Sequence, residues 1–315
     1  MFTLELLYAC TASTLILSWL FAGFYPIVRR WLIELPAVLA SKLIVLFSIL
    51  PLVTVTLVLL FYSQPFLNEL LVYSHCHDGV CGPHWLHLPV SNMLSSGLLL
   101  LVFAVFILFI TVITRQIARS RNYWLMMQGL SRLEGENGFR IVESEKLTAW
   151  CAGMWKPQVY ISRGLLNQLS ESQLNMVLAH EHCHANNKDN LRKSVLHWST
   201  LHWPRKLKQR IRTDFTNKIE LSCDAAAVIH EQDTTGFKQA IQLITQHCSR
   251  ADVEKAVKLN ERHNLLHDEL QKLQLMSQQS FIKSWLLGFM LLVFWFAVIL
   301  LTSQLLHPML EFISR

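Results

Sequence analysis

The sequence predicts an α-helical membrane protein, with four transmembrane helices and a cytoplasmic, mainly α-helical domain that contains a small β-sheet. Of its 315 residues, 52% are hydrophobic and only 16% are charged, a balance that excludes an ordinary soluble chain. The apolar residues are concentrated in four runs, each long enough to form the roughly 20-residue helix that crosses a bilayer. A polar block of single-domain size separates the third run from the fourth.

The four apolar runs are the first elements that the sequence predicts. The last two contain no charged residue, whereas the first carries Glu5 and the second Lys42, whose long side chain can reach the headgroups. A cleaved signal peptide is the alternative for the first run, but no Lys or Arg precedes it. The runs occupy about residues 2–25, 36–62, 93–114 and 284–306. We expect three spans in residues 1–114 with an outer loop at 63–92, a domain at 115–281, a fourth span at 282–306 and an outer tail at 307–315.

Basic residues beside the runs predict the orientation, because Lys and Arg near membrane spans are retained in the cytoplasm. Arg29 and Arg30 follow the first run and Arg115 and Arg119 follow the third, whereas the outer loop contains neither Lys nor Arg. We expect a multi-pass protein of the bacterial inner (cytoplasmic) membrane, with both termini outside and the domain in the cytoplasm. The net charge of +6 fits this layout, and no basic and aromatic pattern predicts direct nucleic-acid binding.

Two of the seven cysteines, Cys76 and Cys81, lie in the expected outer loop among four histidines. Cysteines in an oxidising compartment usually pair, so a disulfide is the favoured interpretation. A free or metal-binding pair is the alternative, because thiolate and imidazole suit soft or borderline metals. The histidines are His75, His77, His84 and His87. The other five cysteines need no special role.

The polar block begins with a helix that continues the third run over residues 115–133, followed by a turn at 134–138. Strands are predicted at 139–143 and 158–161, where β-formers gather. The four residues Ser170-Glu171-Ser172-Gln173 are typical of a helix N-terminus, and apolar residues at helical spacing follow.

This helix carries the sequence His180-Glu181-His182-Cys183-His184, an H-E-x-x-H motif. Positions i and i+4 share one helix face, so the first and last histidines can offer two imidazoles to one Zn²⁺, with the glutamate beside the attacking water. His182 is rotated by about 200° and should face elsewhere. The alternative is an amphipathic helix with surface histidines.

A downstream helix offers the carboxylate that such a site needs. Glu220 can bind zinc, and Asp224, one turn later, can accept the outer N–H of a ligand histidine. Glu181 would take the proton of the water and pass it to the leaving amine. Candidates for oxyanion stabilisation are His197, His202 and His230, and spacing does not choose among them.

These residues resemble the BlaR/MecR-type integral-membrane zinc metallopeptidases of the gluzincin group. The likeness includes the segment 149–162, the motif with Asp189 following it, Glu220 with Cys223-Asp224, Glu261-Arg262, and the four spans. The resemblance implies that His180, His184 and Glu220 bind zinc, that Glu181 activates water and that Asp224 supports the site. It also implies an antirepressor that cleaves a cytoplasmic repressor of the BlaI/MecI/CopY type, itself, or both.

One departure bears on the signal that such a protease would transmit. Members of the family that sense β-lactams carry a penicillin-binding domain after the fourth span, and this chain ends nine residues after Leu306. The signal should therefore enter through the outer loop, the spans or a partner, and a homodimer is left open.

Two alternatives remain for the function. A membrane quality-control zinc protease of the CAAX or heat-shock type shares the H-E-x-x-H and Glu-x-x-x-Asp arrangement. A non-enzymatic metal-sensing membrane receptor would need a closed site of four ligands, and three are evident.

Overall fold

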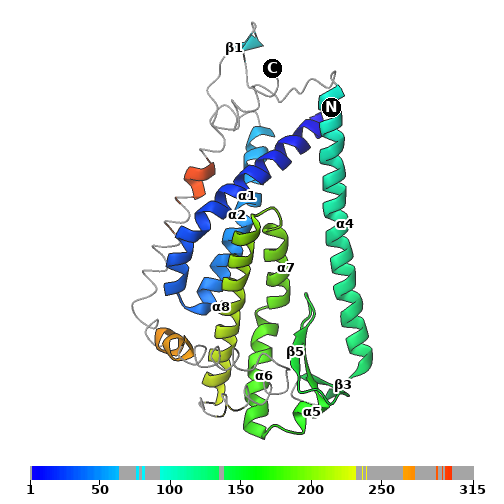
Figure 1. Cartoon of the computed structure of the whole chain (residues 1–315), viewed down its shortest axis with the longest axis vertical. Helices are drawn as coiled ribbons and strands as arrows, with labels where there is room; N and C mark the ends of the chain where they lie inside the picture. The colour runs from blue at the N-terminus through cyan, green and yellow to red at the C-terminus, as the bar shows by residue number, and fades with distance from the viewer. Residues whose placement is uncertain are drawn as a thin grey trace.

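The computed structural model describes residues 2–63, 76–77, 80–81, 93–134, 138–231, 236, 239, 265–273, 289, 293 and 295–299. Its labelled elements are α1 (Phe2–Glu34), α2 (Ala37–Ser63), β1 (Cys76–His77), β2 (Val80–Cys81), α4 (Met93–Leu130), β3 (Ser131–Glu134), β4 (Phe139–Val142), β5 (Ala149–Ala152), β6 (Gln158–Ser162), α5 (Arg163–Leu166), α6 (Glu171–Asn186), α7 (Asp189–Ser199) and α8 (Arg205–Glu231). Strand β1 lies at one end of the elongated molecule and α6 lies with the sheet at the other (Figure 1).

Two of the described helices are long and apolar enough to cross a membrane. These segments, Ser13–Glu34 in α1 and Ala37–Leu57 in α2, are called the candidate spans below. They overlap the first two predicted spans, although the first begins and ends later in the chain than the predicted 2–25. The third predicted run forms the first part of α4, but it is not among the helices that pass this test. The fourth run lies mostly outside the described residues. The structure thus supports two of the four predicted spans.

Helix α4 passes without a break from the third apolar run into the polar block, as the sequence predicts. It ends at Leu130, however, and the next four residues form β3, so the helix predicted to residue 133 is too long. The reason is tertiary, because Ser131–Glu134 pairs with β4 in an antiparallel ladder. Pairing with a neighbouring strand overrides the local helical preference of these residues.

The sheet has four strands in the order β3-β4-β6-β5, with β4 and β6 parallel and the other pairs antiparallel. Strands β4 and β6 correspond to the two predicted strands, and the edge strands β3 and β5 were not predicted. Ile141 and Ile161, in the two central strands, pack with Leu178 and Ala185 of α6 in one buried cluster. The sheet therefore fixes the helix that carries the H-E-x-x-H motif.

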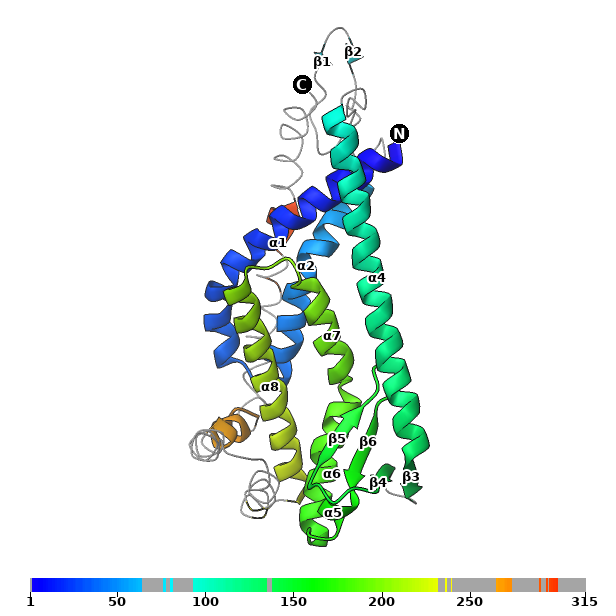
Figure 2. The same cartoon turned by 45° about the vertical axis from the view of Figure 1, so that its right-hand side comes forward.

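The candidate spans share a hydrophobic core with α7 and α8. Tyr25 and Phe47 of the spans pack around Trp203, and the cluster continues through Phe215 of α8. Figure 2 shows α7 and α8 running alongside α1 and α2. The sequence predicts the spans and the domain as separate parts, whereas in the structure they share this core. Hydropathy does not distinguish an apolar side chain that lipid covers from one that protein covers.

The outer loop is described only at β1 and β2, an antiparallel pair in which Cys76 lies opposite Cys81. The other loop residues lie outside the described part of the chain. The pairing of the two cysteines as a disulfide stays a prediction.

Candidate metal centre

The motif helix α6 begins where the sequence predicts. The side chain of Ser170 accepts a hydrogen bond from the backbone N–H of Gln173, whose own side chain accepts one from the N–H of Ser170. This capping box satisfies two backbone donors that the first turn leaves unpaired. Three turns into the helix, His180 and His184 point the same way, with their Nε2 atoms 3.2 Å apart.

Helix α8 places the carboxylate of Glu220 opposite these two nitrogens. Its two oxygens lie 3.7 Å from the Nε2 atoms of His180 and His184. In a tetrahedral zinc site with bonds of about 2.0–2.2 Å, ligand atoms lie roughly 3.3–3.6 Å apart. The spacing of the three side chains therefore fits such an ion. Only a small shift of the Glu220 carboxylate towards the two histidines is needed.

Each histidine is held from behind by a buried carboxylate. His180 Nδ1 lies 3.1 Å from Asp224, and His184 Nδ1 lies 2.8 Å from Asp189. The two carboxylates are 0% and 2% exposed. A proton on each Nδ1, held by a carboxylate, leaves each Nε2 with a free lone pair directed at the same point, which is the tautomer that a metal requires. The contact of Asp189 was not predicted.

The charges and the burial of this cluster shift two pKa values. Burial raises the pKa of the Glu181 carboxyl, the charges of His180 and His184 lower it and Glu220 raises it, with a net rise. Burial lowers the pKa of His180, but Asp224, Glu181 and Glu220 raise it by more in sum. A carboxylate whose pKa is raised is a better proton acceptor than an exposed one.

A pocket of about 370 Å³ opens beside the cluster, between α4, β5 and α7, with Trp150, Tyr123 and Lys193 among its lining residues. Strand β5 forms one edge of the sheet, and Asn190 of α7 donates to the outward carbonyls of Cys151 and Gly153. Burial, followed by the charges of Glu181 and Asp189, raises the pKa of the Cys151 thiol to about 12. The edge strand therefore lies within electrostatic reach of Glu181.

Two further cysteines meet behind the cluster, between α6 and α8. The thiol of Cys223 donates a hydrogen bond to the sulfur of Cys183. This hydrogen bond lowers the pKa of Cys183 to about 7 and raises that of Cys223. Cys223 Sγ also lies 3.4 Å from His184 Nδ1. Both are free thiols, and no pattern in the sequence places them together, because they are forty residues apart.

The remaining predicted histidines lie elsewhere in the described part of the chain. His182 faces the other side of α6, where its ring approaches Gly138. Burial, followed by the charges of Arg212 and Lys208, lowers the pKa of His197, and burial, followed by the charge of Lys208, lowers that of His202. His230 is exposed beside Glu231 at the end of α8. None of the four belongs to the described side chains whose ligand atoms come together.

Comparison with known proteins agrees with this geometry. The model of peptidase family M48 matches residues 127–285, slightly more than half of the chain, and this segment includes α6, α7 and α8. No curated protein and no solved structure matches.

Proposed function

The chain belongs to peptidase family M48 and is therefore a metallopeptidase, and on this premise we propose that it is a membrane-associated zinc endopeptidase. The observation that carries the proposal is the set of three side chains, His180, His184 and Glu220, whose ligand atoms meet at distances that suit zinc. Three protein ligands leave one position open, as catalytic zinc sites do. A closed structural site, as a metal-sensing receptor would have, needs a fourth ligand.

The residues around the site divide the chemistry of peptide hydrolysis. Zinc, when bound, supplies Lewis acidity that polarises the scissile carbonyl and acidifies a water molecule. The Glu181 carboxylate accepts a proton from that water as its oxygen attacks the carbonyl carbon, and delivers the proton to the nitrogen of the leaving amine as the C–N bond breaks. Asp224 and Asp189 hold the Nδ1 protons of the two histidines.

A polypeptide substrate would reach this site along the outer edge of β5, where it would have to replace the contacts of Asn190 with the carbonyls of Cys151 and Gly153. An extended peptide can pair with an exposed strand edge through its backbone, which gives binding that is largely independent of sequence. The pocket beside β5 offers room for side chains next to the scissile bond. This arrangement supports an endopeptidase that acts on extended segments.

The test is the isosteric change Glu181→Gln in the full-length protein, purified in detergent. It removes the proton acceptor and leaves the three ligands, so zinc content should be retained while cleavage of an unfolded protein falls by about 10²- to 10⁴-fold. His182→Gln, one residue away with a side chain that faces away from His180 and His184, is the control and should keep full activity. Retained cleavage in the Glu181 variant would exclude the mechanism.

We propose further that the enzyme transmits a signal, cleaving a repressor of the BlaI/MecI/CopY type or itself. The support is the packing of the candidate spans directly against the helices that carry Glu220 and Asp189, which joins membrane and metal centre mechanically. The rival is quality control of membrane proteins. New protein N-termini, compared between cells with the wild type and with Glu181→Gln, separate the two: a few cytoplasmic sites support signalling, and many sites in membrane proteins support quality control.

A further inference from the structure

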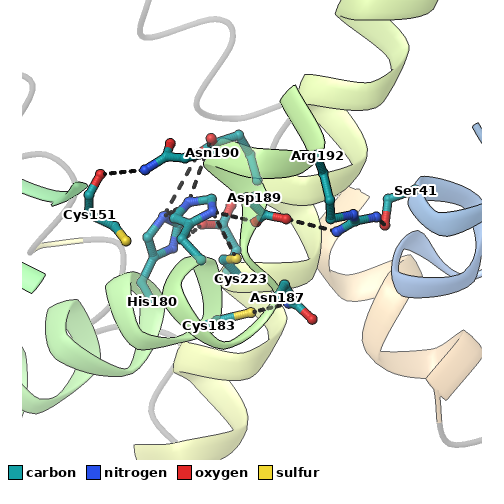
Figure 3. A network of polar contacts seen from close by, with 12 residues as sticks. Ser41, Cys151, His180, Cys183, Asn187, Asp189, Asn190, Arg192 and Cys223 are labelled. Carbon is teal, nitrogen blue, oxygen red and sulfur yellow. Dashed lines mark hydrogen bonds and ion pairs between the residues drawn. The ribbon is translucent and has the colours of Figure 1, made fainter. Parts of the chain in front are cut away.

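A chain of polar contacts leads from the metal ligand His184 into the candidate span α2. His184 Nδ1 lies 2.8 Å from one oxygen of Asp189, and Arg192 Nη1 donates to the other oxygen at 2.8 Å. The second guanidinium nitrogen, Nη2, donates to the hydroxyl of Ser41 at 2.7 Å. Figure 3 shows Arg192 between Asp189 and Ser41.

Most of these polar contacts lie in the protein interior, where each group depends on its partner for hydrogen bonding. Asp189 and Ser41 are each 2% exposed, and the guanidinium lies 5.2 Å from the ring centroid of Phe215. The space around Arg192, which Val38 of α2 and Ile219 of α8 help to enclose, has no room for a water molecule. The Arg192 side chain is 16% exposed, so solvent replaces a lost contact only in part, and a largely buried charged group without its partner is costly.

The fork of Arg192 joins the two sides of the chain. A guanidinium is planar and rigid, so fixing Nη2 on Ser41 also fixes the direction in which Nη1 meets Asp189. Asp189 in turn sets the orientation of the imidazole of His184. Removing a side chain that supports a metal ligand from behind typically weakens metal binding by about 10- to 100-fold.

We propose that Arg192 and Ser41 are positioning residues of the metal centre, so that the placement of the candidate span α2 sets the metal affinity of the site. The inference rests on the proposed zinc site and names its regulation. Because coupling is reciprocal, metal binding should also stabilise α2 against α7.

Ser48, elsewhere in α2, provides a closely matched control for Ser41. Ser41 and Ser48 both lie in α2, are both buried, and each donates its hydroxyl to the carbonyl three residues earlier. Each also accepts a hydrogen bond from α7, Ser41 from Arg192 and Ser48 from Ser199. Only Ser41 connects to Asp189, so an effect on helix packing alone would appear equally in both alanine variants.

The experiment measures zinc affinity of the purified full-length protein by competition with a chelator. Ser41→Ala should weaken zinc binding by roughly 2- to 10-fold, the scale of one hydrogen bond, while Ser48→Ala should match the wild type. In an Arg192→Gln background, Ser41→Ala should have no further effect. The second readout is hydrogen exchange of the α2 amides near residue 41, which zinc should slow in the wild type and not in Ser41→Ala.

The outcomes separate the inference from the function on which it rests. Equal affinities in Ser41→Ala and Ser48→Ala would overturn the inference and leave the zinc peptidase intact. A wild-type protein that binds no zinc would overturn both. An effect of Ser41→Ala that persists unchanged with Arg192→Gln would show that Ser41 acts by another route, which also overturns the proposal.

Discussion

At the scale of single residues, the metal centre is built in two layers that make different contributions. Glu220 offers an oxygen to the ion itself, whereas Asp224 and Asp189 lie behind the histidines and fix their tautomers. Loss of a direct ligand removes a bond to the metal. Loss of a supporting carboxylate leaves the bond in place with a less well oriented imidazole.

The affinities of single variants should therefore form two groups. Asp224→Asn and Asp189→Asn should each weaken zinc binding by about 10- to 100-fold, and Glu220→Gln should weaken it more than either. Chelator competition on the purified variants measures this order, with Glu231→Gln on the same helix as the control. Equal losses in the variants of Glu220 and Asp224 would mean that the ligand assignment is wrong.

The sequence could reveal the members of this site that share a helix, because helical spacing alone places them on one face. His180 with His184, and Glu220 with Asp224, are such pairs. Asp189 escapes this reasoning. A turn at Lys188, which takes a left-handed conformation with φ 51°, places Asp189 next to His184. A lysine rarely adopts this conformation, so the sequence does not predict the turn.

At the scale of elements, α8 is fastened to α1 by a cluster of polar contacts. Tyr25 and Arg29 both donate to Asp214, at 2.8 Å and 2.6 Å. The side chains of the ion pair are 31% and 17% exposed. Because α8 carries Glu220, this fastening also holds a candidate metal ligand in place.

Asp214→Ala should lower the stability of the protein by about 1.5–3 kcal/mol, the usual value for hydrogen bonds to a charged group. It leaves Arg29 without that partner and should reduce the melting temperature in detergent by several degrees. Glu143→Ala removes a contact of Arg163 at 2.9 Å whose side chains are 37% and 60% exposed, and it should cost at most about 1 kcal/mol. A similar fall in both variants would show that the α1–α8 contact is no stronger than a surface pair.

The sequence predicts the elements better than their packing. The long helices and the two central strands follow from apolar runs and β-formers. The edge strands β3 (Ser-Arg-Leu-Glu) and β5 (Ala-Trp-Cys-Ala) lack the group of β-branched and aromatic residues that marks β4 and β6. The packing of α1 and α2 on α7 and α8 was not predictable, because hydropathy does not show whether lipid or protein covers an apolar face.

At the scale of the whole molecule, the candidate span α2 lies between the metal centre and the predicted outer loop (Figure 1). Ser41 lies near the start of α2 and contacts the network behind the metal centre. The helix is 27 residues long, about 40 Å, and ends at Ser63, where the predicted outer loop begins. Strand β1 of that loop lies at the end of the molecule opposite α6 (Figure 1). A displacement of α2 that starts at the loop would therefore reach the side chains that orient His184.

We expect the outer loop to carry the signal through Cys76 and Cys81, which lie opposite each other in β1 and β2. Reduction or oxidation of these cysteines, or binding of a soft metal such as copper, should change the proteolytic rate about 5-fold or more, as coupling energies of 1–3 kcal/mol imply. The coupling requires that the two states of the loop favour different positions of α2, so tight metal binding alone would not demonstrate it. In sealed vesicles, an impermeant reductant added to the outer face should spare Cys183 and Cys223, which the predicted orientation places on the inner face. Replacing both loop cysteines with serine should abolish the response, and Ser41→Ala should weaken it although the loop is intact. An unchanged response in the double serine variant would reduce the loop to a connector and place the input in the spans or a partner protein.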